Sequence, residues 1–159
     1  MKPKIEFAVF ILTHGRADNV VTTGTLKNHG YTGKIFYIVD NEDKQIAQYE
    51  ENFGKENVIV FDKKKLADSI DEGNNFDERR TITHARNATF DIAKKLGVKY
   101  WIQLDDDYTG FRYRMYEKGN PLPIKNLDRV LKTMLDFYKS VNCLSVAMSQ
   151  GGDFLGGTN

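Results

Sequence analysis

The sequence has little cysteine, little net charge and no long hydrophobic run, and each shortage excludes a class of protein. The single cysteine among 159 residues, Cys143, cannot form an intramolecular disulfide, which suits a reducing compartment. The formal net charge of +1 provides no global field that would draw the chain to nucleic acid or to a membrane. The apolar stretch over residues 7–12 is far shorter than the roughly 18 residues that a membrane span needs. We therefore expect a cytoplasmic protein with no membrane partner.

What the sequence does contain is an alternation of apolar, strand-forming runs with helical patterns. Continuous apolar strands are typical of parallel sheets that helices cover on both faces. The length fits one domain with its own core. We therefore predict a single domain over residues 1–159, an α/β fold with a three-layer α/β/α sandwich and a mostly parallel central sheet. The expected strands are residues 7–13, 34–39, 57–61, 99–104, 111–115 and 143–148, and the expected helices are residues 18–28, 44–52, 79–96 and 126–140.

The last expected strand, residues 143–148, contains the single cysteine within an apolar run. A free cysteine in such a run behaves as a small hydrophobic residue more often than as a reactive thiol. We therefore expect Cys143 to be buried.

Polar motifs follow the expected strands, where α/β sheets bind their ligands. The first strand ends in Thr13-His14-Gly15-Arg16, and the backbone amides and the Arg16 guanidinium there could meet a phosphate or a base. The second strand ends at Asp40, and the helix before the fourth strand contains Ala85-Arg86-Asn87. These motifs predict a ligand site at the carboxyl edge of the sheet.

The fourth expected strand leads directly into Asp105-Asp106-Asp107. Three adjacent carboxylates repel one another, and a divalent cation is the simplest way to offset that repulsion. Mg²⁺ and Mn²⁺ bind one or two carboxylates and complete their shell with substrate phosphates and water. In an extended backbone Asp105 and Asp107 point the same way, which makes them the predicted metal ligands. The alternative is an acidic turn that is simply solvated.

Taken in order, these motifs resemble the donor half of glycosyltransferases with the GT-A fold, especially the family-2 type. In that group a first strand ends in a Thr-x-x-Arg-like turn and a second strand ends in aspartate. An Ala-Arg-Asn helix then precedes a strand that closes in Asp-x-Asp. The resemblance covers about the first 110 residues. It implies a nucleotide-diphospho-sugar transferase-like fold and transfer of a sugar from a nucleoside diphosphate donor, expected to be a UDP-sugar, to a hydroxyl acceptor.

By the same resemblance, Thr13 and Asp40 contact the nucleotide base and Arg86 helps to hold the donor. Asp105 faces the ribose or the water shell of the metal. Asp107 ligates the Mn²⁺ or Mg²⁺ that bridges the diphosphate, where a cation neutralises charge on the departing nucleoside diphosphate.

After the metal motif the chain departs from the family pattern. Enzymes of this type continue through an acceptor-binding half that supplies the catalytic base, and we expect this domain to lack part of that half. Asp153 is the one candidate base in the terminal segment, and its glycine neighbours would let a substrate approach closely. A tail with one acidic residue is the alternative.

Two further features suggest DNA as the acceptor. Arg112 and Arg114 alternate with Phe111 and Tyr113, a stripe that could meet phosphates or stack on bases. The run over residues 101–108 and the Gly-Gly-Asp-Phe segment resemble a compact phage-type group of glycosyltransferases, associated with hydroxylated-pyrimidine biosynthesis, that modify DNA bases. A phage-encoded enzyme would act in the host cytoplasm.

Two other functions fit parts of the sequence. A nucleotidyltransferase would also use aspartates and magnesium, but its first strand is usually followed by a loop richer in glycine and lysine than residues 13–16. A non-catalytic module that binds a sugar nucleotide is the second alternative, because the acceptor half is short.

Overall fold

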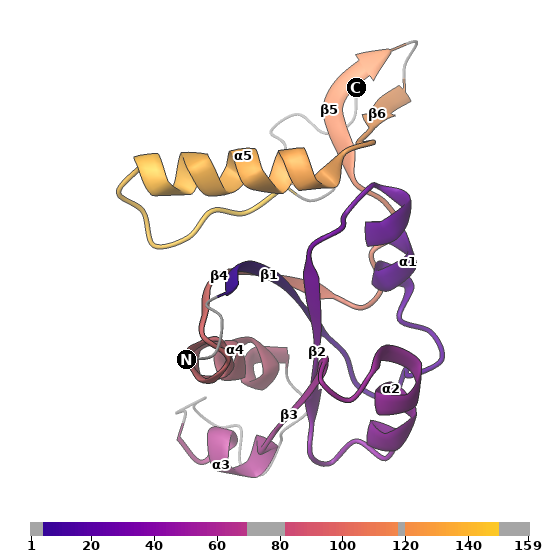
Figure 1. Ribbon diagram of the computed structural model, residues 1–159, viewed down its shortest axis with the longest axis vertical. Coiled ribbons are helices and arrows are strands. Elements are labelled where there is room, and N and C mark those ends of the chain that lie inside the picture. Colours follow the sequence, from indigo (N-terminus) through magenta and orange to yellow (C-terminus); the bar gives the residue numbers. More distant parts are fainter. Residues whose placement is uncertain (1–4, 70–81, 118–119, 150–159) are drawn as a thin grey trace.

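The computed structural model of the protein describes residues 5–69, 82–117 and 120–149, and it confirms the predicted α/β architecture (Figure 1). A four-stranded sheet with the order β3-β2-β1-β4 forms the centre, and every neighbouring pair of its strands is parallel. The strands are β1 (Ile5–Leu12), β2 (Lys34–Asp40), β3 (Val58–Phe61) and β4 (Val98–Asp105).

Helices cover both faces of this sheet, because the inner strands are apolar on both sides. In β1, Val9 and Ile11 face one core while Ala8, Phe10 and Leu12 face the other. The first core is closed by α1 (Val21–Asn28), α2 (Ile46–Phe53) and α5 (Leu127–Ser140), and the second by α4 (Ile82–Leu96) with the short α3 (Lys63–Ala67).

Local sequence signals explain where the longer helices begin and end. Helix α4 stops at Leu96 because Gly97 follows with φ of 72°, a left-handed conformation that favours glycine. Helix α5 begins after Asn126, whose side-chain oxygen accepts a hydrogen bond from the Arg129 backbone N–H at 2.9 Å. Both features agree with the helices predicted over residues 79–96 and 126–140, although residues 79–81 lie outside the described part of the chain.

A small antiparallel hairpin precedes α5 and lies apart from the main sheet in Figure 1. Its strands are β5 (Arg112–Glu117) and β6 (Asn120–Pro123). The first corresponds to the strand predicted over residues 111–115, and the second was not predicted. The base of the hairpin lies beside the end of α1, where the Phe111 backbone N–H donates to His29 Nε2 at 3.4 Å.

The strand predicted over residues 143–148 is wrong. That segment forms no strand, Cys143 is exposed rather than buried, and Leu144 is 99% exposed. A strand needs a partner to pair with, and within the described residues no strand pairs with the outer side of β4. The strand propensity of this run was therefore overridden by its tertiary surroundings.

None of the described helices is long and apolar enough to cross a membrane.

Candidate active site

The parallel register brings the predicted motifs to one edge of the sheet. Leu12 at the end of β1 pairs with Ile38 of β2 on one side and with Asp105 of β4 on the other. The Thr13 backbone N–H then donates to the Ile38 carbonyl at 3.2 Å, so the loop after β1 begins between the other two strand ends. Thr13–Arg16, Asp40 and the three aspartates therefore share the carboxyl edge, as the topology of the fold predicts.

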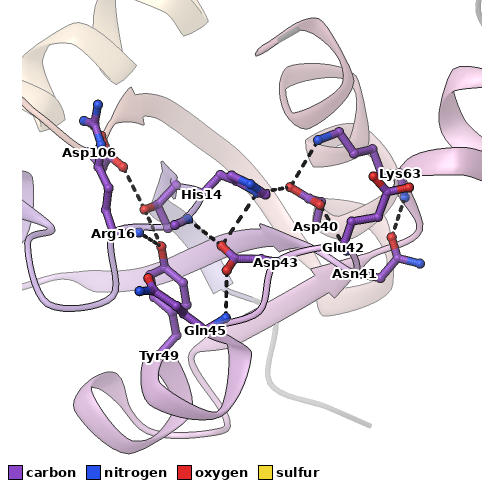
Figure 2. A network of polar contacts seen from close by, with 12 residues as sticks. His14, Arg16, Asp40, Asn41, Glu42, Asp43, Gln45, Tyr49, Lys63 and Asp106 are labelled. Carbon is purple, nitrogen blue, oxygen red and sulfur yellow. Dashed lines mark hydrogen bonds and ion pairs between the residues drawn. The ribbon is translucent and has the colours of Figure 1, made fainter. Parts of the chain in front are cut away.

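Asp106, the central aspartate of the triplet, turns into the protein. Its Oδ2 accepts a hydrogen bond from the Thr13 hydroxyl at 2.7 Å, and its Oδ1 pairs with Arg16 Nη1 at 2.8 Å (Figure 2). The Asp106 side chain is 10% exposed, whereas that of Arg16 is about half exposed. Asp106 therefore ties the loop after β1 to the end of β4 and is not available to a ligand.

Tyr49 of α2 forms two hydrogen bonds with the loop after β1, next to this contact. Its hydroxyl lies 3.0 Å from Thr13 Oγ1 and accepts the backbone N–H of Arg16 at 2.8 Å. Because Thr13 uses its one hydrogen toward Asp106, Tyr49 must donate to Thr13. Burial raises the pKa of Tyr49 above its usual value, which keeps that donor protonated. The Thr13 hydroxyl is thus held by bonds within the protein on both sides.

Asp107, in contrast, is open to solvent, and Asp105 is partly exposed. Asp105 is 35% exposed at its side chain, and both its oxygens accept from Arg86 Nη2, at 3.0 and 3.1 Å. Asp107 is exposed in the turn after β4 and makes no hydrogen bond or ion pair within the described part of the chain. The structure thus places Arg86 beside Asp105.

Buried Thr22, near the start of α1, fixes the backbone of the triplet. Its hydroxyl donates to the Asp105 carbonyl at 2.6 Å and accepts from the Tyr108 N–H at 2.9 Å. Its own N–H donates to the Asp106 carbonyl at 3.1 Å. Sequence reasoning gave Thr22 no role, because nothing in the local pattern shows that α1 meets a segment more than eighty residues away.

A second acidic cluster lies at the end of β2. His14 Nδ1 is 2.6 Å from Asp40 Oδ2 and 3.7 Å from Asp43 Oδ2, and Lys63 Nζ approaches Asp40 Oδ2 to 3.6 Å (Figure 2). The side chains of Asp40 and Asp43 are 6% and 1% exposed, whereas His14 is 57% exposed. Both carboxylates are therefore covered, and the imidazole forms the outer surface of the cluster.

Asp43 also holds the loop after β1 in place. One of its oxygens accepts the Gly15 N–H at 2.7 Å and the other accepts the Gln45 N–H at 2.8 Å. Gly15 has a φ of 65°, a conformation that glycine adopts without strain. The sequence analysis gave no role to Asp43 or to Lys63, whose side chain is only 12% exposed.

Asp105 and Asp107 are the two carboxylates at this edge that could bind a divalent cation. Within the described residues, no group of three or more His, Cys, Asp or Glu side chains is arranged to hold a metal. Mg²⁺ characteristically binds one or two protein carboxylates and takes its other ligands from phosphates and water. Asp105 and Asp107 fit that requirement, while Arg86 adds a positive charge beside them. Asp153, the candidate base, lies outside the described residues.

Carboxylates and a guanidinium thus gather at the carboxyl edge of a parallel α/β sheet, which is where such folds bind their ligands. A family model described as TET-associated glycosyltransferase matches residues 7–159. The chain belongs to that family, and it is a glycosyltransferase, as the resemblance in its sequence implied. No curated protein and no solved structure matches it.

Proposed function

We propose that this glycosyltransferase moves a sugar from a UDP-sugar to a hydroxyl group on a DNA pyrimidine, with Mn²⁺ or Mg²⁺ as cofactor. One observation carries the metal-dependent donor site: both oxygens of Asp106 are bonded to Thr13 and Arg16, whereas Asp107 is exposed and Asp105 is partly exposed beside Arg86.

Asp105 and Asp107 would hold the cation together with the donor diphosphate. When bound, the cation supplies Lewis-acid stabilisation of the charge on the departing nucleoside diphosphate. Arg86, with its side chain 46% exposed, adds a second positive group that can reach a phosphate oxygen while it stays paired with Asp105. The donor then runs along the edge of the sheet, with its nucleoside toward Asp40.

The half-exposed guanidinium of Arg16 lies between these two ends. It is anchored to Asp106 through Nη1, which leaves its other N–H groups for the donor. This position suits a contact with the ribose or a phosphate.

The transfer itself needs a base. Asp153 would take the proton from the acceptor hydroxyl as that oxygen bonds to the anomeric carbon of the sugar. The bond from that carbon to the β-phosphate oxygen breaks, and UDP leaves with the electron pair.

The hairpin supports DNA as the acceptor. Arg112, Tyr113 and Arg114 are consecutive and exposed on β5, which lies apart from the main sheet in Figure 1. Guanidinium groups contact phosphates and an exposed tyrosine can stack on a base. The family name also associates its members with TET, which agrees with an acceptor made from a hydroxylated pyrimidine.

A transfer assay tests the proposal. The protein is incubated with radiolabelled UDP-glucose, Mn²⁺ and an oligonucleotide that carries a hydroxymethylated pyrimidine, beside an unmodified oligonucleotide of the same sequence. We expect label on the modified DNA alone, loss of transfer with EDTA, and loss of transfer but retained UDP binding in Asp153→Asn. Transfer that is unaffected by EDTA would contradict the metal-dependent part of the proposal.

A further inference from the structure

We propose that His14 reads the base of the donor nucleotide through its Nε2 atom, and that Asp40 acts only by orienting His14. This inference rests on the proposed UDP-sugar donor and deepens it. Family resemblance placed Asp40 itself on the base. In the structure, however, the Asp40 carboxylate is buried beneath the imidazole, so His14 stands between it and any ligand.

The hydrogen bond to Asp40 fixes which nitrogen of His14 carries the proton. A carboxylate can only accept, so the 2.6 Å contact requires a hydrogen on Nδ1. In the neutral ring, Nε2 then carries a lone pair and can only accept. His14 is 57% exposed, and Nε2 makes no hydrogen bond within the described residues. With a neutral imidazole, the cluster therefore presents one oriented acceptor to the outside.

The charges around His14 favour a neutral base over a phosphate at this position. Asp40 and Asp43 lie directly behind the imidazole, and Lys63 supplies one opposing positive charge. Two carboxylates against one ammonium leave a local negative charge, which disfavours a phosphate. The phosphates instead find cation ligands and Arg86 at the end of β4. The base therefore belongs at the His14 end of the edge.

A hydrogen-bond acceptor at Nε2 favours a base whose ring nitrogen N3 carries a hydrogen. Uracil has a hydrogen on N3 and can donate it to Nε2, whereas the N3 of cytosine is itself an acceptor and would face a second lone pair. Discrimination of this kind is strong because an unpaired polar group in a site is costly. His14 would accordingly select a uridine donor over a cytidine donor.

Calorimetric titration with UDP, CDP and N3-methyl-UDP in the presence of Mn²⁺ tests this assignment. We expect the wild-type protein to bind UDP at least about tenfold more tightly than CDP or N3-methyl-UDP. In His14→Phe, which keeps an aromatic ring but has no nitrogen, the three ligands should bind within about twofold of one another. In Lys132→Ala, a control on the exposed face of α5, the wild-type preference should persist.

A second variant tests whether Asp40 acts by orienting His14, and it distinguishes that role from a simple loss of the folded structure. The Glu42 backbone N–H donates to Asp40 Oδ1, while His14 contacts Oδ2. In Asp40→Asn combined with Lys63→Met, Glu42 would hold the amide oxygen and turn the NH₂ group toward His14. Nδ1 must then accept, which moves the ring hydrogen to Nε2 and turns it into a donor. The preference for UDP over CDP should fall at least tenfold in this folded variant.

The outcomes distinguish this inference from the proposed function. If no nucleoside diphosphate binds to the folded wild-type protein, the proposed donor site fails. If UDP binds in a manner that depends on Mn²⁺ and Asp107, yet His14→Phe still rejects N3-methyl-UDP and CDP, only the role of His14 is overturned. Equal wild-type affinity for UDP and N3-methyl-UDP would overturn it as well.

Discussion

Two acidic clusters lie on the same edge of the sheet, and they differ in how their carboxylates are used. At the end of β2, Asp40 and Asp43 are both buried and bonded to groups of the protein. At the end of β4, Asp106 is buried in the same way, but Asp107 is exposed and Asp105 is partly exposed. In the first cluster both carboxylates hold the surrounding loops in place and His14 covers them. In the second cluster only Asp106 has such a structural role, and a ligand can reach the other two aspartates.

This difference shows that burial and pairing, and not residue type, separate structural aspartates from available ones. A buried carboxylate that loses its partners costs stability, because the partners are left unsatisfied. An exposed carboxylate that is replaced leaves the fold unchanged within about 0.5 kcal/mol. The two groups of aspartates should therefore respond to substitution in opposite ways.

The largest expected effect follows from removal of Asp107. In Asp107→Ala, transfer of sugar from UDP-glucose should fall at least about 100-fold, because one of two cation ligands is lost. The midpoint of thermal unfolding should stay within about 2 °C of wild type. Initial rates at saturating Mn²⁺, with thermal melts of both proteins, measure the two quantities. A marked drop in the melting temperature would show that Asp107 stabilises the fold instead.

Asp106→Ala should produce the reverse pattern. The substitution removes the acceptor of the Thr13 hydroxyl and the partner of Arg16. We expect a loss of about 2 kcal/mol in the free energy of unfolding, most of it from the buried Thr13 contact, since the Arg16 side chain is half exposed and its ion pair counts for less. Urea unfolding checks this. An unchanged free energy of unfolding would show that Asp106 does not stabilise the fold.

Arg86→Met tests a residue that pairs with Asp105 and that we also expect to bind the donor. The variant keeps the length of the side chain but removes the guanidinium from Asp105. Because both the pairing of Asp105 and a positive charge for the diphosphate are lost, UDP should bind about tenfold more weakly. Titration of UDP at fixed Mn²⁺ measures the change, and Arg129→Met on α5 serves as the matched control. Equal affinity in Arg86→Met would remove Arg86 from the donor site.

Tyr49→Phe should have the smallest effect, about 1 kcal/mol at neutral pH, through loss of the hydroxyl that bonds Thr13 and Arg16. Burial raises the pKa of Tyr49, so the folded state keeps a proton that the unfolded chain loses above about pH 10. Stability should therefore fall as the pH rises beyond that value, and less steeply in Tyr49→Phe. Urea unfolding at pH 7 and at pH 10.5 measures both. An unchanged slope in the variant would contradict the role of the buried hydroxyl.

Much of this fold could be predicted from the sequence, because its main elements are set locally. The apolar runs of β1, β2 and β4 appear directly, and so does the helical periodicity of α4 with its terminal Gly97. The strand predicted over residues 143–148 failed because pairing depends on a neighbour that a local pattern cannot supply. Strand β6 was missed because its two prolines disfavour a strand assignment.

The candidate site was predicted less completely than the fold. The positions of Asp40, Arg86 and the triplet at strand ends and on the preceding helix followed from their order along the chain. The inward turn of Asp106 toward Thr13 and the covering of Asp40 by His14 did not. Both depend on contacts between residues at least 26 positions apart, which only the folded chain brings together.

Calorimetric titration of UDP tests the central claim, that Asp107 is an available metal ligand within a donor site. Wild-type protein is titrated with Mn²⁺ and with EDTA, and Asp107→Ala is titrated with Mn²⁺. The account predicts binding in wild-type protein with Mn²⁺ and its loss in the other two conditions. Binding of equal strength in all three, or no binding to a folded wild-type protein, would contradict it.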